Sequence, residues 1–541
     1  MDRRKFIKSV GTAGAAAFVL PRFSIASSKS PNSKLNVAFV GVGGVGGMAI
    51  NGMKSENAVA FCDVDANLSG WHKKENPKSQ FFQDYRVMLD KMGKDIDAVC
   101  VSTPDHSHFK ITLDAMQCGK HVCVQKPLVH NIWQCRELER ARRYYKVQTQ
   151  MMNQGHATEG IRLLKEWHDT GIAGPIREVH VMCSGPSWWN GNPKATPYFR
   201  KPKEGFPLNK EKVPANLNWD MWLNQGKYAD YNNIYTPLSW RGFWDYGTGM
   251  LGDWFCHTGD APVWILDLKG DCTVELLDVN CSYDQKVFIP NSSTVKWSFP
   301  KTDKREAVTM YWYDGNKHPI TRPKDIDEGK NTMTSGMYMI GDNHTLEHGA
   351  RPNSPRFTNS RFFDEFKRSG KAKNRVIPRV REGSLYCEWI DAIKGDGPEA
   401  GSNFKYASQI TEVALLGVLA QRFGGKIEWD SENMRATNRP ELDEYIREPE
   451  RKGWESKEVP RPSFFERLFG EPLSETAFTA PSLFRRGAFF LFARSPRVKS
   501  NAPRFGFRII RPMRFRSLDL RKRPRAASVP PQFRNANSGG E

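Results

Sequence analysis

The sequence predicts an α/β protein in which a doubly wound parallel sheet is followed by a second α/β domain with a large, open, mostly antiparallel sheet. Two observations carry this prediction. From residue 35 to about residue 152, apolar strand-like runs alternate with helical stretches, which is typical of parallel strands joined by crossover helices. Between residues 272 and 312 the strand-like runs follow one another without helices, which favours antiparallel pairing.

The elements follow from the same periodicities. In the first domain we expect strands over 35–40, 59–62, 98–101, 121–124 and 147–151, with helices that include 107–117 and 132–145. In the second we expect a helix over 159–168, a strand over 176–183, a long loop rich in Pro, Asn, Gly and Trp, and a helix over 407–423. The predicted boundaries are a signal or linker over 1–33, a first domain over 34–152, a second over 153–454 and a tail over 455–541.

The positive charge of the chain lies at its two ends. Of the formal net charge of +20, residues 1–33 carry +5 and residues 461–541 carry +12, which leaves about +3 for everything between. The body of the protein is therefore nearly neutral, and the composition gives it no large basic surface for nucleic acid.

The N-terminal segment resembles a twin-arginine export signal. Two arginines at residues 3–4 precede a weakly apolar run over 10–20. Eleven residues are too few to cross a hydrocarbon core of about 30 Å as a helix. We therefore expect a removed signal, export of the folded protein to the periplasm or beyond, and no stable membrane anchor. A basic start with a chance arginine pair is the alternative.

The C-terminal tail differs in composition from the rest of the chain. Residues 461–541 hold 15 Arg, two Lys and 12 of the 32 Phe, without a sustained helical or strand period. Basic residues interleaved with aromatics are able to bind single-stranded nucleic acid or anionic membrane. The interpretation we favour is a disordered appendage, or a misassigned reading frame, with no nucleic-acid partner. The ten cysteines contain no C-x-x-C pair, so we expect neither a disulfide framework nor a structural metal.

A glycine-rich loop predicts a dinucleotide site. Residues 41–46 follow a predicted strand and open a predicted helix, with Gly41, Gly43 and Gly46 in the G-x-G-x-x-G pattern. Asp63 ends the next strand, where a carboxylate accepts hydrogen bonds from the adenosine ribose and repels a 2′-phosphate. The pattern favours NAD over NADP. A surface turn or helix cap is the alternative for Asp63, and Asp65 competes for its role.

Three later segments sharpen the prediction: residues 102–108, 125–127 and 253–260. Together with 84–86, 152–156 and 402–404, their order resembles the Gfo/Idh/MocA oxidoreductases, which include glucose-fructose oxidoreductase and inositol dehydrogenase. The resemblance runs from about residue 34 to 454. It implies a Rossmann domain, bound NAD, a sugar, polyol or glycoside as substrate, and a homo-oligomer formed through the second-domain sheet.

The resemblance also implies roles for single residues. Lys126 matches a lysine that contacts the substrate oxygen, although Gln125 replaces the glutamate before it and leaves the partner of the lysine open. His257 is implied as the acid/base and Asp253 as its relay or substrate-binding partner. The positions implied to hold the cofactor are Gly41, Gly43, Gly46, Asp63, Thr103, Pro104, His108, Gln125, Lys126 and Asn153.

The residue types suit this chemistry. A lysine ammonium stabilises negative charge that develops on a hydroxyl oxygen as hydride leaves carbon. Asp253 and His257 are four residues apart, so on a helix they share one face with Asp260 one turn further. An i,i+4 pair that serves only helix stability is the alternative. A metal site from Asp253, His257 and His108 is possible by residue type, but the implied reaction needs none.

Aromatic and histidine residues in the loops leave further possibilities open. The tryptophans at 188–189 and 240–244 are candidates for a wall that stacks on a sugar ring, or for plain core. His344 and His348 are weaker candidates for reaching a neighbouring site.

The leading hypothesis is reversible hydride transfer between a sugar or polyol hydroxyl and a tightly held NAD. The first alternative is an NAD-dependent glycosidase that oxidises, eliminates and re-reduces its substrate. The second is a carbohydrate-binding protein that has kept a nucleotide fold without catalysis.

Overall fold

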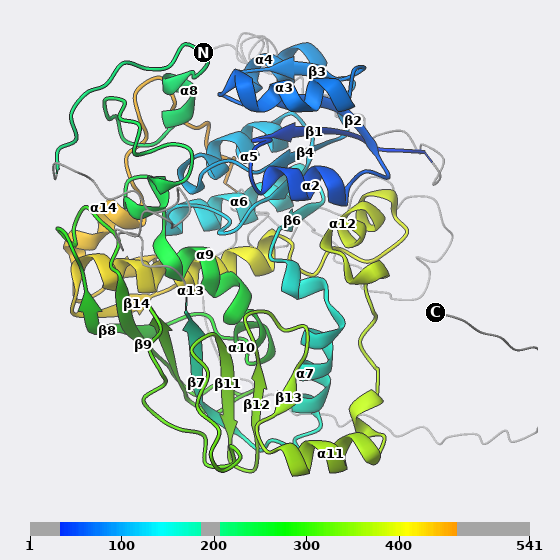
Figure 1. Ribbon diagram of the computed structural model, residues 1–541, viewed down its shortest axis with the longest axis vertical. Helices are drawn as coiled ribbons and strands as arrows, with labels where there is room; N and C mark the ends of the chain where they lie inside the picture. The colour runs from blue at the N-terminus through cyan, green and yellow to red at the C-terminus, as the bar shows by residue number, and fades with distance from the viewer. Residues whose placement is uncertain (1–32, 185–205, 462–541) are drawn as a thin grey trace, which may run out of the picture. The chain divides into compact units, whose positions relative to one another are not determined.

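The computed structural model describes residues 33–184 and 206–461. Figure 1 shows the parallel first sheet and the larger second sheet, with helices packed around both. The predicted export signal, the tryptophans at 188–189 and the Arg/Phe-rich tail lie outside the described residues.

The first sheet has six parallel strands in the order β3-β2-β1-β4-β5-β6, which confirms the predicted doubly wound topology. The order reverses between β1 and β4, the point where such sheets bind ligands beyond the carboxyl ends of the strands. The strands are β1 (Asn36–Val40), β2 (Asn57–Cys62), β3 (Gln80–Phe82), β4 (Ala98–Val101), β5 (His121–Val124) and β6 (Thr149–Met151). Only β3 has no counterpart among the predicted strands, because three residues carry too little pattern.

Helices cover this sheet, and three of them, α3, α4 and α6, begin at side-chain caps that the sequence supplies. Asp65 and Asp84 each accept a hydrogen bond from the backbone N–H two residues on. Asn131 and Gln134 form a reciprocal capping box. The helices are α2 (Gly46–Gly52), α3 (Ala66–Glu75), α4 (Tyr85–Met92), α5 (His108–Gln117) and α6 (Ile132–Tyr145).

The second sheet has nine strands in the order β13-β12-β11-β7-β10-β9-β8-β14-β15. Every neighbouring pair is antiparallel except β7 with β10, so the predicted mostly antiparallel sheet is confirmed. Its strands are β7 (Ile176–Cys183), β8 (Cys272–Asn280), β9 (Ser292–Phe299), β10 (Val308–Asp314), β11 (Gly336–Gly341), β12 (Thr345–His348), β13 (Arg356–Phe357), β14 (Lys426–Asp430) and β15 (Arg435–Ala436).

One long helix, α13 (Phe404–Phe423), belongs to the cores of both domains. It packs against α6 of the first domain and against β8, β9 and α9 (Gly249–Thr258) of the second, and Figure 1 shows it between the two sheets. It is buried around most of its circumference. The remaining helices are α7 (Glu159–Asp169), α8 (Trp219–Leu223), α10 (Asp260–Ile265), α11 (Ser360–Arg368), α12 (Leu385–Lys394) and α14 (Asp443–Ile446).

Gly417 marks the closest packing on α13. A Cβ added there would overlap the Trp297 indole and lie 2.7 Å from Leu251 Cδ1. Trp297 is fully buried and its Nε1 donates to the Val413 carbonyl at 3.2 Å, so the ring has little room to move.

We expect Gly417→Ala to lower the free energy of unfolding by about 1–3 kcal/mol, because overpacking outweighs the gain in helix propensity. Gly70→Ala, on exposed α3 with open space around its Cβ, is the matched control and should stabilise by up to about 1 kcal/mol. Denaturant unfolding of both variants checks the difference, and a stabilised Gly417→Ala would contradict it.

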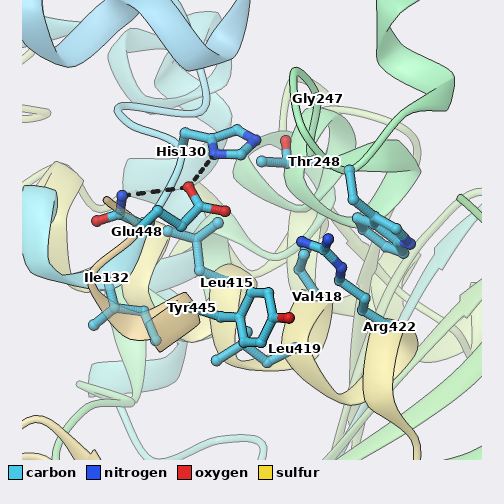
Figure 2. A pocket seen from close by; sticks show the side chains of 12 residues that line it. His130, Ile132, Gly247, Thr248, Leu415, Val418, Leu419, Arg422, Tyr445 and Glu448 are labelled. Atoms are coloured by element: carbon cyan, nitrogen blue, oxygen red, sulfur yellow. Dashed lines mark hydrogen bonds and ion pairs between the residues drawn. The ribbon is translucent and has the colours of Figure 1, made fainter. Parts of the chain in front are cut away.

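A partly buried ion pair holds the segment after α14 against the first domain. His130 Nδ1 lies 2.7 Å from Glu448 Oε2, in a pocket that α13 also lines (Figure 2). Burial would lower the pKa of His130, but Glu448 outweighs burial and raises it. Burial would likewise raise the pKa of Glu448, and His130 outweighs it and lowers that pKa. The pair is thus charged on both sides at mildly acidic pH.

Glu448→Gln should therefore cost stability in a pH-dependent way. A raised folded pKa for His130 means that its contribution is complete below pH 6.5 and is lost as pH rises through the folded value. The Glu448 contribution is complete above pH 4.5 and is lost as pH falls through its own lowered value. We expect a loss of about 1.5–3 kcal/mol between these limits, and a smaller one at alkaline pH.

Unfolding curves across this pH range test the expectation. Glu458→Gln is the control, because Glu458 pairs with Arg447 at the surface, where an ion pair contributes about 0–1 kcal/mol. A pH-independent loss in Glu448→Gln would show that packing, not charge, holds this segment.

Candidate functional site

A lysine of the first domain and a carboxylate of the second meet at the carboxyl end of the parallel sheet. Lys126 follows β5, and its Nζ donates to the Asp253 carbonyl at 3.0 Å and to Asp253 Oδ1 at 2.6 Å. Asp253 lies in α9, and both side chains are largely buried. Burial would raise the pKa of Asp253, but Lys126 and Arg241 outweigh it and hold the pKa below its ordinary value. The carboxylate is therefore ionised at neutral pH.

His257 lies one turn further along the same helix. It is buried, and its Nδ1 has no hydrogen-bond partner among the described residues. Burial and the positive charges of Lys126 and Arg351 lower its pKa well below 6.5, against the opposing effect of Asp253. The imidazole is thus neutral at physiological pH and able to accept a proton.

The geometry assigns Asp253 a partner that helical spacing did not indicate. The sequence suggested Asp253 as the partner of His257, four residues on, whereas its carboxylate contacts Lys126 and lies 3.7 Å from Arg241 Nε. Asp253 also supplies the carboxylate neighbour that Gln125 does not provide for Lys126.

The glycine loop after β1 is packed too closely for side chains at its three motif positions. Gly41 has φ +79°, and a Cβ there would lie 2.6 Å from the Ser102 carbonyl oxygen. A Cβ on Gly46 would overlap the Gly41 carbonyl, and one on Gly43 would lie 2.9 Å from Leu68. These are the demands that a tight turn and close helix packing place on a dinucleotide loop.

Asp63 ends β2 beside this loop and braces it. Its Oδ2 accepts from the Val42 N–H at 2.9 Å and its Oδ1 from the Asp65 N–H at 3.0 Å. Burial raises the pKa of Asp63, with the backbone hydrogen bonds opposing. Asp65 instead caps α3 and accepts from Asn216 Nδ2 at 2.6 Å, whereas Asp63 is the carboxylate that is hydrogen-bonded to the glycine loop. The arrangement favours Asp63 over Asp65 for contact with a ribose.

The other predicted cofactor residues line the same edge. Asn153, after β6, is fully buried, and neither polar atom of its side chain is hydrogen-bonded to a described residue. Gln125 Nε2 is likewise buried without a hydrogen-bond partner among the described residues. Thr103 accepts from Ser107 Oγ at 2.8 Å, and Pro104 precedes the turn into α5. Orphaned buried amides beside a glycine cradle fit a polar cofactor, since unsatisfied groups of this kind are costly.

His108 ties two of these loops together. Its Nδ1 lies 2.8 Å from the Pro127 carbonyl oxygen and its Nε2 lies 2.7 Å from that of Thr103. Both nitrogens are thereby occupied, which argues against the metal site considered with Asp253 and His257. In the part of the chain that the structure describes, no group of three or more His, Cys, Asp and Glu side chains is placed to hold a metal.

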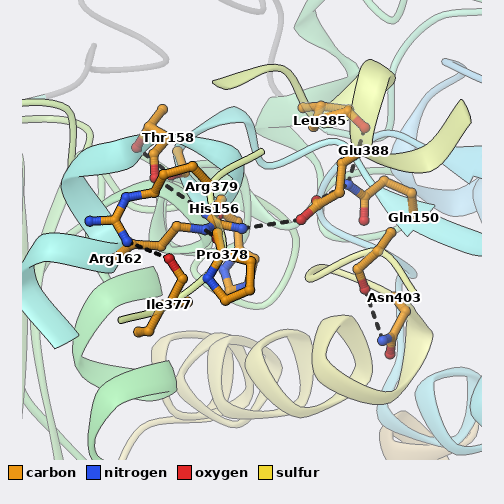
Figure 3. Close-up of polar contacts among 12 residues, drawn as sticks. Gln150, His156, Thr158, Arg162, Ile377, Pro378, Arg379, Leu385, Glu388 and Asn403 are labelled. Atoms are coloured by element: carbon orange, nitrogen blue, oxygen red, sulfur yellow. Dashed lines mark hydrogen bonds and ion pairs between the residues drawn. The ribbon is translucent and has the colours of Figure 1, made fainter. Parts of the chain in front are cut away.

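A buried polar network lies behind His257, and sequence reasoning named only parts of it. Asp260 accepts from Tyr406 at 2.6 Å and lies 2.9 Å from His156 Nδ1. Arg162 donates to the His156 carbonyl at 2.8 Å and to Glu388 at 3.1 Å (Figure 3). The motif at 402–404 was the available signal, because Asn403 caps α13 and so places Tyr406.

The aromatic residues at 240–244 contribute mainly to the core. Trp240 and Trp244 are buried, and Trp244 Nε1 donates to the Gln285 carbonyl at 2.7 Å. His344 stacks on Phe362, and His348 is buried near enough to Asp260 for that carboxylate to affect its pKa. Trp254, on α9, is the aromatic ring that contacts His257.

Comparison with known families agrees with this geometry. Residues 35–153 match the oxidoreductase family described as an NAD-binding Rossmann fold, and residues 201–299 match the C-terminal α/β domain of the same family. The chain belongs to the Gfo/Idh/MocA oxidoreductase family. Its first domain is thus of the NAD-binding type, as the glycine loop and Asp63 predicted.

Curated relatives match over part of their length. A glycosyl hydrolase family 109 protein of Solibacter usitatus is 32% identical over 156 residues, which is 25% of this chain and 35% of that protein. An α-N-acetylgalactosaminidase of Shewanella oneidensis is 28% identical over 194 residues, 30% of this chain and 42% of that protein. The chain therefore spans about two-fifths or less of these relatives.

Solved structures include an inositol dehydrogenase homologue from Azotobacter vinelandii, complexed with NADH and myo-inositol. Its TM-score is 0.48 at 15% identity, covering 74% of this chain and 98% of that one. A levoglucosan dehydrogenase complexed with NADH and levoglucosan has a TM-score of 0.47 at 14% identity, and the match covers 73% of this chain and 99% of that one.

Among the described residues, no helix is long and apolar enough to span a bilayer.

We expect Asp63→Ala to weaken NAD binding by about 10- to 100-fold, the equivalent of one lost hydrogen bond to a charged group. The same change should narrow the preference for NAD over NADP, because the repulsion of a 2′-phosphate is removed. Fluorescence titration with both dinucleotides measures the two effects. Asp65→Ala is the control and should alter helix stability more than affinity. An unchanged NAD affinity in Asp63→Ala would contradict the assignment.

Proposed function

We propose that the protein is an NAD-dependent enzyme that oxidises a ring hydroxyl of a sugar or polyol, or reduces the corresponding ketone. The observation that carries the proposal is the meeting of Lys126, Asp253 and a neutral His257 at the carboxyl edge of an NAD-binding sheet. NAD, when bound, supplies the nicotinamide carbon that exchanges hydride with the substrate.

The chain's own residues handle the hydroxyl. The Lys126 ammonium has three donors, of which Asp253 takes two through its carbonyl and Oδ1. The third is available to a substrate oxygen, where it stabilises negative charge as the alcohol is oxidised. His257 accepts the hydroxyl proton in its neutral form and returns it in the reverse direction. Asp253 orients the lysine through these two contacts.

A second candidate is a redox-neutral glycosidase. The match to glycosyl hydrolase family 109 proteins favours it, although the match covers a minor part of those proteins. In this scheme oxidation of a ring hydroxyl acidifies the neighbouring C–H, the aglycone leaves, water adds and the ketone is reduced. Both candidates share the first step and the same residues. In the noncatalytic carbohydrate-binding alternative, the contact between Lys126 and Asp253 serves only to join the two domains.

Two further proposals concern the setting of the enzyme. The paired arginines at residues 3–4 support export of the folded protein by the twin-arginine route to the periplasm or beyond. The face of the second sheet that carries the half-buried Tyr311 is proposed as the surface through which copies pair. Tight retention of NAD follows from export, because little free cofactor is available outside the cytoplasm.

Lys126→Met is expected to lower kcat by about 10²–10³-fold, and His257→Gln by about 10²–10⁴-fold, with bound NAD retained. Lys165→Met, which breaks a surface pair with Asp169, is the matched control and should behave as the parent. Native mass spectrometry reports bound NAD, and a panel of sugars and aryl glycosides reports turnover.

The products separate the two candidates. Net NADH formation supports the dehydrogenase, whereas glycoside cleavage without NADH accumulation supports the glycosidase. The limb of the pH profile due to His257 should fall below pH 6.5, in accord with its lowered pKa. Retained NAD with no turnover on the whole panel, and no effect of Lys126→Met on sugar binding, would leave the noncatalytic alternative.

A further inference from the structure

Arg351 lies near His257, although it comes from a distant part of the second domain. It lies in the turn between β12 and β13, in the second domain, and its guanidinium packs over the Trp254 ring at 5.2 Å from the ring centre. Trp254 in turn makes an edge contact with the His257 ring. The arginine is close enough for its charge to lower the pKa of His257.

The backbone of this turn is held firmly against the first turn of α7. A Cβ on Gly155 would lie 2.6 Å from Pro352 Cδ, and one on Gly160 would overlap the Pro352 carbonyl. Thr158 Oγ1 donates to the Gly155 carbonyl at 2.8 Å and lies 3.4 Å from the Pro352 carbonyl oxygen. Arg351 is therefore presented by a packed turn and not by a loose loop.

Arg351 differs from the other buried or half-buried arginines of the second domain. Arg162 pairs with Glu388 and Arg379 with Glu166. Among the described residues, no carboxylate lies within ion-pair distance of Arg351, and its guanidinium donates no hydrogen bond. It is half-buried nevertheless.

Among the described residues, no carboxylate balances the charge of Arg351. Asp253, the carboxylate beside His257, already pairs with Lys126 at 2.6 Å and lies 3.7 Å from Arg241. Asp260 is engaged with His156 and Tyr406 further back. A partly buried site with excess positive charge is stabilised by an anion, and the guanidinium fork is suited to bind a planar oxyanion through two parallel hydrogen bonds.

We propose that the substrate is an anionic sugar, and that Arg351 binds its carboxylate or sulfate group while Lys126 and His257 act on a ring hydroxyl. Trp254 supplies a ring beside Arg351 for the apolar face of the sugar. The inference rests on the proposed function only for the position of the reacting hydroxyl. The preference of the site for an acidic over a neutral sugar is a property of binding, so it is measured separately from turnover.

The bound anion would also act on the base. Its negative charge offsets that of Arg351, so the pKa of His257 rises towards its ordinary value when an acidic sugar is seated. The proton acceptor thereby becomes stronger in the complex than in the free enzyme.

The test is equilibrium binding to the purified holoenzyme by calorimetry, with matched probes. Methyl β-glucuronide is compared with methyl β-glucoside, methyl α-galacturonide with methyl α-galactoside, and each neutral glycoside with its 6-O-sulfate. We expect at least one acidic probe to bind about 10- to 100-fold more tightly than its neutral partner. Comparison of the uronides with the 6-O-sulfates shows whether the site prefers a carboxylate or a sulfate.

Arg351→Gln should remove most of this preference while leaving affinity for the neutral partner within about threefold. Arg351→Lys should restore part of it, because charge is kept but the fork is lost. Arg361→Gln, on exposed α11, is the matched control. Bound NAD and thermal unfolding, recorded for each variant, establish that the proteins compared are folded.

The inference is overturned if every acidic probe binds no more tightly than its neutral partner, or if no acidic probe binds at all. A preference for the acidic probe that survives Arg351→Gln also overturns it. These outcomes are distinct from failure of the proposed function, which shows as absence of NADH formation and of glycoside cleavage with any sugar. Turnover of neutral sugars with no acid preference would retain the enzyme and remove the anionic substrate.

Discussion

The contact between Lys126 and Asp253 is the interaction on which the arrangement of the site depends. The lysine comes from a loop of the first domain and the carboxylate from a helix of the second, so a single ion pair aligns the cofactor edge with the substrate side. A pair that is largely removed from water is costly unless its geometry is good. Here the shared core around α13 holds both partners in register, and the loss of either would leave a buried charge alone.

The charges around this ion pair also keep Asp253 and His257 in different protonation states. Asp253 is kept ionised by Lys126 and Arg241, while His257 is kept neutral by burial and by the cations around it. Neighbouring groups whose pKa values are pushed apart by their surroundings are suited to different tasks. In this site the carboxylate orients a cation, and the neutral imidazole is the group suited to exchange a proton. Neither role could be assigned from residue type alone, since an i,i+4 Asp–His pair fits several functions.

Much of the fold was predictable because its signals are local. The strand and helix periods and the glycine loop all act over a few residues, and the two sheets were predicted from the periods. The strand at Gln80–Phe82 was too short to carry a period. The tryptophans at 240 and 244 looked equally suited to a sugar wall or a core, and burial favours the core.

Contacts between residues far apart in the sequence could not be predicted from local patterns. Lys126 and Asp253 lie 127 residues apart in the sequence, so the i,i+4 spacing to His257 suggested the nearer partner instead. Arg351 carries no motif, and its position depends on how a turn of the second sheet packs against Gly155 and Gly160. Tyr406 and Glu388 joined the network around Asp260 and Arg162 for the same reason.

The helix that serves both cores has an evolutionary consequence. Because α13 contributes side chains to α6 on one side and to β8 and β9 on the other, neither domain has a complete interior of its own. Recombination that exchanged one domain for that of a distant relative would have to preserve this helix surface on both sides. A substitution on α13 is therefore expected to affect the cofactor domain and the substrate domain together, whereas the turn that carries Arg351 lies outside this shared interior.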